Sequence, residues 1–113
     1  MKISILIPTV NRSHLLKAMM ESLLRNDLRD CELIVVDQSI DHLTESLIAS
    51  YAPKCESLRY IRSVGSGAAH SRNIGWKAAH GELIAFTDDD AWVDEHWITS
   101  IRQVMASEMA GTI

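Results

Sequence analysis

Residues 81–90 read GELIAFTDDD, a short apolar run followed directly by three carboxylates, Asp88, Asp89 and Asp90. A short apolar run closed by polar residues is typical of a buried strand. Adjacent carboxylates repel one another unless a cation, a proton or solvent relieves the repulsion. Oxygen ligands suit hard cations such as Mg²⁺ or Mn²⁺, which leave coordination positions to water and substrate phosphates. The stretch predicts a strand that ends at a metal-diphosphate site, although solvated acidic turns and helix N-termini give the same local pattern more often.

Strand-like and helix-like segments alternate along the whole chain. The strands are expected at 2–7, 32–36, 58–61 and 82–86, and the helices at 13–24, 42–51, 68–79 and 95–109. The first, second and fourth helical segments carry apolar residues at intervals of three and four positions, and the third lies between a glycine-containing loop and the helix breaker Gly81. This order predicts an α/β fold with a mostly parallel sheet, right-handed crossovers and helices on both faces. With 113 residues, the chain has room for a single domain, 1–113.

The composition is that of an ordinary globular protein, with 47% hydrophobic and 23% charged residues. The net charge of −4 disfavours nucleic acid as the main partner, because nucleic-acid binding needs a basic surface. Cys31 and Cys55 lack metal-ligand spacing, so both are expected as reduced thiols of a cytoplasmic protein. No apolar run is long enough for a signal peptide or a membrane span. Attachment to the inner face of a membrane would need another segment.

Polar and glycine residues follow every predicted strand at the edge where parallel sheets bind ligands. These residues are Thr9, Asn11 and Arg12 after the first strand, Asp37, Ser39 and Asp41 after the second, Gly65 and Gly67 after the third, and the three carboxylates after the fourth. Helix capping explains Asn11 and Asp41 equally well, with Asn11 or Ser13 as the cap of the first helix, but it does not explain three adjacent carboxylates. A dinucleotide-binding glycine motif is missing after the first strand, which disfavours nicotinamide and flavin enzymes.

Five segments make the chain resemble the N-terminal half of inverting family 2 glycosyltransferases, which have the three-layer, Rossmann-like GT-A fold. They are ISILIPTVNR at 3–12, ELIVVD at 32–37, SRNIG at 71–75, AHGE at 79–82 and TDDD at 87–90, together with Gly67 and Trp97. The resemblance covers essentially all 113 residues. It rests on the order and spacing of the segments, because none of them is decisive alone.

The resemblance implies a nucleotide-diphosphate sugar as donor, of the UDP type, with Mg²⁺ or Mn²⁺ as cofactor and inverting transfer to the hydroxyl group of a sugar or glycan acceptor. It implies nucleotide binding by Pro8, Thr9, Asn11, Arg12, Asp37, Ser39, Gly67, Arg72, Asp88 and Asp89, and metal binding by Asp88 and Asp90. Thr9 and Asp37 match positions that recognise the base. In similar enzymes the catalytic base lies well beyond the Asp-x-Asp motif, so it is expected beyond Ile113.

Two departures from the family pattern qualify this interpretation. The family often continues Asp-Gly-Ser after the position of Asp37, whereas this chain has Gln38 and Ser39, which affects the ribose contacts and the choice of base. The acceptor-binding half is expected to be absent, so the chain alone is expected to be inactive, with an uncovered strand edge that favours a homodimer. One alternative is a non-catalytic nucleotide-sugar-binding domain or an inert remnant that self-associates. A phosphatase with an aspartate nucleophile is disfavoured, because the first strand ends in Pro8 and Thr9.

Overall fold

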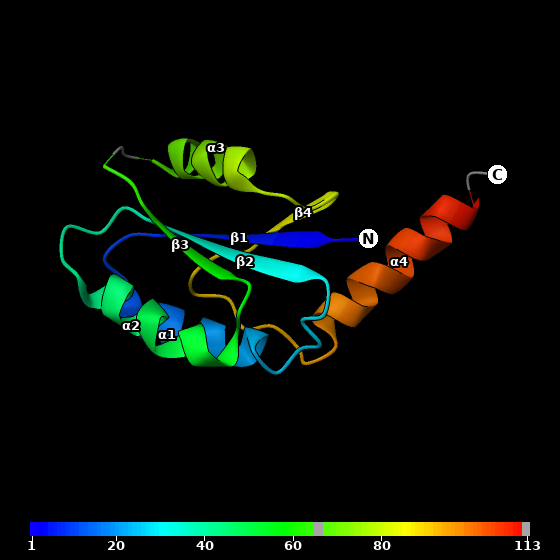
Figure 1. The fold of residues 1–113 in the computed structure, drawn as a ribbon, viewed down its shortest axis with the longest axis horizontal. Coiled ribbons are helices and arrows are strands. Elements are labelled where there is room, and N and C mark those ends of the chain that lie inside the picture. Colours follow the sequence, from blue (N-terminus) through cyan, green and yellow to red (C-terminus); the bar gives the residue numbers. More distant parts are fainter. Residues whose placement is uncertain (65–66, 112–113) are drawn as a thin grey trace.

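The computed structural model describes residues 1–64 and 67–111, so the predicted loop residue Gly65 lies outside the described part. The elements in chain order are β1 (Ile3–Thr9), α1 (Ser13–Leu23), β2 (Cys31–Asp37), α2 (Leu43–Tyr51), η1 (Ala52–Lys54, a 3-10 turn), β3 (Leu58–Arg62), α3 (Ala68–Ala78), β4 (Leu83–Phe86) and α4 (Trp97–Gly111) (Figure 1). The predicted alternation is confirmed, and each predicted boundary lies within two residues of the observed one.

The four strands form one parallel sheet in the order β3-β2-β1-β4. The chain proceeds outward from β1 through β2 to β3, and then returns to place β4 on the other side of β1. The direction of progression therefore reverses between β1 and β4. In open parallel sheets, the crevice beyond the carboxyl ends of the strands at such a reversal is the usual place for a ligand.

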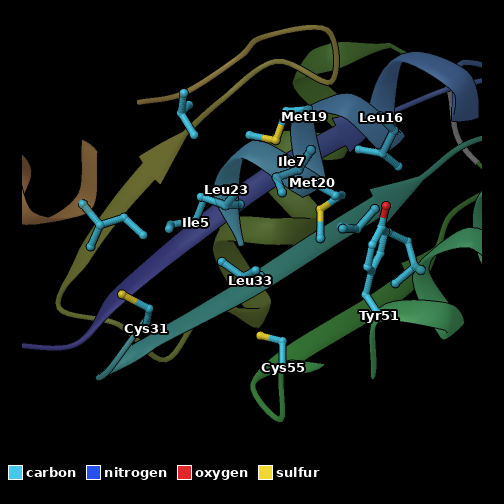
Figure 2. Close-up of a cluster of buried hydrophobic side chains, with 14 of the residues drawn as sticks. Ile5, Ile7, Leu16, Met19, Met20, Leu23, Cys31, Leu33, Tyr51 and Cys55 are labelled. Carbon is cyan, nitrogen blue, oxygen red and sulfur yellow. The ribbon is translucent and has the colours of Figure 1, made fainter. Parts of the chain in front are cut away.

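The sheet lies between two layers of helices, as predicted: α1 and α2 cover one face and α3 covers the other (Figure 1). Strand side chains alternate between the two faces. Ile5 and Leu33 belong to the larger cluster, which Figure 2 shows packed against α1 and α2, whereas Leu6, Ile34 and Val36 form a smaller cluster against α3. The larger cluster also contains the free thiols of Cys31 and Cys55.

The segment that follows the three carboxylates is fastened to the end of α1. Asn26 accepts a hydrogen bond from the Ile98 backbone N–H at 3.0 Å and donates one to the Asp94 carbonyl at 3.0 Å, while the Ser22 hydroxyl accepts from the Val93 N–H at 3.1 Å. Ile98 is fully buried, and Trp97 and Ile101 pack against the larger cluster, whereas the C-terminal part of α4 projects from the body of the domain (Figure 1). Within residues 1–64 and 67–111, no helix has the length and apolar character needed to cross a membrane.

The prediction that Asn11 or Ser13 caps α1 is wrong. The cap position of α1 is Arg12, and its side chain makes no capping hydrogen bond. Asn11 instead adopts a φ of 52°, accepts a hydrogen bond from the Ile40 backbone N–H at 3.1 Å, and donates its own N–H to the Ser39 hydroxyl at 2.7 Å. Its role is to join the loop after β1 to the loop after β2.

Candidate functional site

A pocket of about 310 Å³ lies beyond the carboxyl ends of β1, β2 and β4, next to the first turn of α3. It is lined by Pro8, Thr9, Val10, Arg12, Gln38, Gly67, Ala68, Ser71, Asp88 and Asp89. A smaller pocket of about 140 Å³ shares Pro8, Ala68 and Asp88 with it and adds Arg72, Phe86 and Thr87. The structure thus brings the residues after β1 and β4 together with the start of α3, as the parallel topology predicts.

Some residues that the family resemblance assigned to the nucleotide site line neither pocket. Pro8, Thr9, Arg12, Gly67, Asp88 and Asp89 line the larger pocket and Arg72 lines the smaller one, whereas Asn11, Asp37, Ser39 and Asp90 line neither. The sequence does not separate these two groups, because a strand end and the loop after it offer side chains in several directions.

The three adjacent carboxylates point to different partners. Asp88 is exposed and borders both pockets. Asp89 is buried and accepts a hydrogen bond from the Thr9 hydroxyl at 2.9 Å. The Arg12 guanidinium lies 3.3 Å from an oxygen of Asp89 and 3.0 Å from an oxygen of Asp90, which is half exposed. The mutual repulsion expected from three neighbouring aspartates is therefore relieved by Thr9, by Arg12 and by solvent.

The three adjacent aspartates could supply only some of the ligands that a divalent cation needs. In the described part of the chain, no three histidine, cysteine or acidic side chains converge into a set that could hold a metal ion. Mg²⁺ sites in phosphate-transferring enzymes commonly use one or two carboxylates and complete the sphere with substrate phosphates and water. Asp88 at the mouth of both pockets suits that arrangement, whereas Asp90 would have to exchange its Arg12 partner.

Asp37 is fully buried, and the surrounding protein uses both of its carboxylate oxygens. One oxygen accepts the Ser39 backbone N–H at 2.9 Å, and the other accepts the Tyr60 hydroxyl at 2.6 Å, with Arg62 at 3.9 Å. Burial, together with the hydrogen bond to Asp37, raises the pKa of Tyr60 to about 12. Asp37 thus holds the turn after β2 against the end of β3, next to the pocket-lining residue Gln38.

Two polar lining residues, Gln38 and Ser71, were not among the predicted nucleotide-binding residues. In the described part of the chain, Gln38 Nε2 and Ser71 Oγ are the buried side-chain polar atoms that lack a hydrogen-bond partner. The side-chain periods of a strand and of a helix could have indicated both positions. Gln38 lies two positions after Val36, whose side chain faces α3, and Ser71 precedes Gly75 by one helical turn on the sheet-facing side of α3.

The sequence model of the family described as "Glycosyl transferase family 2" matches residues 4–113. The chain belongs to glycosyltransferase family 2. Among curated relatives of this family 2 domain, the uncharacterized glycosyltransferase EpsJ of Bacillus subtilis is 33% identical over 91 residues, which make up 80% of this chain and 26% of EpsJ.

Solved structures agree with the family assignment and with the GT-A fold. TarS of S. aureus, residues 1–349 in complex with UDP, aligns over 95% of this chain with a TM-score of 0.86 and 26% identity. The mannosyltransferase PcManGT of Pyrobaculum calidifontis, in complex with GDP-Man and Mn²⁺, aligns over 80% with a TM-score of 0.73 and 27% identity. The aligned part of this family 2 domain spans 32% of the TarS chain and 28% of the mannosyltransferase chain.

Proposed function

We propose that this domain binds the nucleotide-diphosphate part of a UDP-sugar in the larger pocket, as the donor half of an inverting glycosyltransferase. The observation that carries the proposal is the convergence of Thr9, Asp88 and Asp89 at the strand reversal between β1 and β4. TarS, which shares the fold at a TM-score of 0.82 in its complex with UDP-GlcNAc, supports a uridine nucleotide as the donor. Pro8, Arg12 and Gly67 complete the part of the proposed nucleotide site that lines the larger pocket. Asn11, Asp37 and Ser39 line neither pocket, and we propose that they position the loops after β1 and β2 through their hydrogen bonds.

The diphosphate is proposed to lie at the boundary of the two pockets, where Asp88 borders both. Asp88 and Asp90 would hold Mg²⁺ or Mn²⁺, and a divalent cation there neutralises the charge that develops on the leaving diphosphate. Arg72 in the smaller pocket offers a guanidinium, which pairs well with phosphate oxygens. These residues would bind and orient the leaving group.

The catalytic base and the acceptor site are proposed to lie outside these residues. Inverting transfer needs a group that takes the proton from the acceptor hydroxyl. Because the aligned region amounts to about a third or less of each compared protein, the role proposed for these residues is restricted to binding the donor.

Isothermal titration calorimetry of the 113-residue chain with UDP, with and without Mn²⁺, tests the proposal. We expect binding that strengthens when Mn²⁺ is present and weakens about tenfold or more in Asp88→Asn, since one metal-ligating carboxylate is lost. Glu56→Gln removes the same charge from an exposed position before β3 and should leave the affinity unchanged. Absence of heat with UDP under both conditions would support the inert remnant instead, and binding without any dependence on Mn²⁺ would exclude the metal.

A further inference from the structure

The guanidinium of Arg12 has two carboxylate partners that differ in burial. Its Nη1 lies 3.3 Å from Asp89, whose side chain is 6% exposed, and its Nη2 lies 3.0 Å from Asp90, whose side chain is 50% exposed. Asp89 also accepts the Thr9 hydroxyl at 2.9 Å. A buried carboxylate is costly to leave without its partners, whereas a half-exposed one can turn to water or to a cation. The contact with Asp89 is therefore the fixed one, and the contact with Asp90 can be exchanged.

The loop between β1 and α1 holds the backbone of Arg12 in place. Asn11, directly before it, has a φ of 52° and is fixed by hydrogen bonds with the Ser39 hydroxyl at 2.7 Å and the Ile40 N–H at 3.1 Å. The Arg12 carbonyl accepts two backbone N–H groups from the first turn of α1, both at 3.0 Å. The chain is thus fixed on both sides of Arg12, and only its 42% exposed side chain is free to change partners.

The larger pocket offers the Arg12 side chain a second kind of partner. Arg12 lines this pocket together with Asp88 and with Gly67 at the start of α3. A guanidinium carries five N–H donors in a planar fork, so one arm can keep a carboxylate while the other reaches a phosphate oxygen. As long as both arms contact carboxylates, fewer donors of Arg12 remain for a phosphate in the pocket.

We propose that Arg12 exchanges Asp90 for an oxygen of the donor diphosphate when a divalent cation occupies Asp90, and that it keeps its contact with Asp89 throughout. This inference rests on the proposed function. Without the cation, Arg12 neutralises the acidic turn and is not available to the nucleotide. With the cation in place, Asp90 no longer needs the guanidinium, and the freed arm donates a charge-assisted hydrogen bond to the diphosphate. Metal and nucleotide therefore bind cooperatively through Arg12, and by linkage each strengthens the binding of the other by the same factor.

A thermodynamic cycle measures this coupling. Calorimetry gives the UDP affinity with and without saturating Mn²⁺, and electron paramagnetic resonance of free Mn²⁺ gives the metal affinity with and without UDP. In Arg12→Met, the UDP affinity should change by about twofold or less without the metal but fall by about tenfold or more with it, the loss expected for one charge-assisted hydrogen bond. Binding of Mn²⁺ alone should instead become stronger, because Asp90 is free. A variant that merely disturbs the fold would not shift the two affinities in opposite directions.

Two further variants and one further probe separate the fork of Arg12 from its charge. Arg12→Lys keeps a positive charge near Asp90, but a single ammonium does not reproduce the planar fork, so the coupling should fall by about fivefold or more while Mn²⁺ alone binds as in the wild type. Arg25→Met removes an arginine charge at an exposed position beyond α1 and should leave the coupling unchanged. Inorganic pyrophosphate should lose affinity for Arg12→Met as UDP does, because the new contact is to the diphosphate.

The outcomes distinguish this inference from the proposed function. Unchanged coupling in Arg12→Met, or UDP and Mn²⁺ affinities that shift in the same direction, would overturn the exchange and leave the proposed function standing. Full coupling in Arg12→Lys would overturn the two-armed contact with Asp89 and the diphosphate. If the wild-type chain binds neither UDP nor pyrophosphate in the presence of Mn²⁺, the proposed function fails and this inference fails with it.

Discussion

The Arg12 guanidinium lies 3.0 Å from the Asp90 carboxylate and also contacts Asp89 at 3.3 Å, so one cation spans two of the three adjacent acids. The side chains of Arg12 and Asp90 are 42% and 50% exposed. Ion pairs of that exposure contribute about 0 to 1 kcal/mol, because solvent screens them. The contact is therefore strong enough to organise the loop and weak enough to be exchanged for a divalent cation.

Substituting Arg12 by methionine should strengthen the binding of Mn²⁺ alone by about two- to fivefold, because the metal no longer competes with the guanidinium for Asp90. Titration monitored by electron paramagnetic resonance of free Mn²⁺ measures this directly. Arg25→Met removes the same charge from an exposed position just beyond the C-terminal end of α1 and should change the affinity far less. Equal or weaker Mn²⁺ binding in Arg12→Met would show that Arg12 and the metal do not share a site.

Most of the secondary structure was predictable because the strands are short apolar runs and three of the four helices carry apolar residues at intervals of three and four positions, whereas α3 was placed by the glycines on either side of it. The direction of individual side chains was harder to predict at the end of β2. The family pattern pointed to Asp37, but Asp37 is the last residue of β2 and its carboxylate turns to Tyr60. Its neighbour Gln38 lines the pocket. Because strand side chains alternate, a one-residue difference in where a strand ends decides which side chain meets the ligand.

The hydrogen bonds between loops were not predictable from sequence either. Nothing local marks Asn26 as the residue that fixes Asp94 and Ile98, or Asn11 as the link between the loops after β1 and β2. These contacts join segments distant in the chain, and they depend on how the helices pack on the sheet rather than on any periodicity. The sequence predicts which strand ends gather at the larger pocket, and packing determines which side chains line it.

A buried carboxylate near the amino end of the interior strand β2 makes stability depend on pH. Glu32 is 2% exposed and accepts hydrogen bonds from the His80 N–H at 2.6 Å, the Ser4 hydroxyl at 2.8 Å and Arg59 at 2.9 Å. Burial alone would raise the pKa of Glu32, but these three hydrogen bonds and the charge of Arg59 outweigh it and lower the pKa below its ordinary value of 4.5.

Glu32→Gln should therefore destabilise the fold by about 2 kcal/mol near neutral pH, since a charge-assisted network is lost. A lowered folded-state pKa contributes stability above the unfolded value, and that contribution disappears as the pH falls through the folded value. The difference between wild type and variant should thus shrink below pH 4.5. Urea unfolding across an acid pH series checks this, with Glu56→Gln as the exposed control. A difference that stays constant with pH would contradict the ionised state of Glu32.

Two glycines should respond differently to alanine. A Cβ on Gly81 would lie 2.6 Å from the Ser4 backbone nitrogen and 3.0 Å from the Lys2 carbonyl oxygen, and backbone atoms of a central strand cannot move aside. Gly81→Ala should cost about 3 kcal/mol of unfolding free energy. A Cβ on Gly75 would meet only the flexible Leu6 and Val36 side chains, and alanine favours the helix by about 1 kcal/mol, so Gly75→Ala should be nearly neutral. Chemical denaturation compares the two, and equal costs would refute the backbone argument.

β4 lies at the edge of the described sheet. Apolar side chains of α4 surround a separate hollow of about 330 Å³, which is lined by Trp97, Ile101, Val104 and Met105. Open strand edges and exposed apolar patches favour association with another chain. We therefore expect the 113-residue chain to form a homodimer as its concentration rises, measured by size-exclusion chromatography with light scattering.

Val104→Lys places a charge in the apolar hollow and should weaken the dimer about tenfold or more, because burying an unpaired charge is costly. Val64→Lys changes a fully exposed valine outside this surface and should leave the dimer intact. A monodisperse monomer at the highest attainable concentration would exclude self-association through this edge.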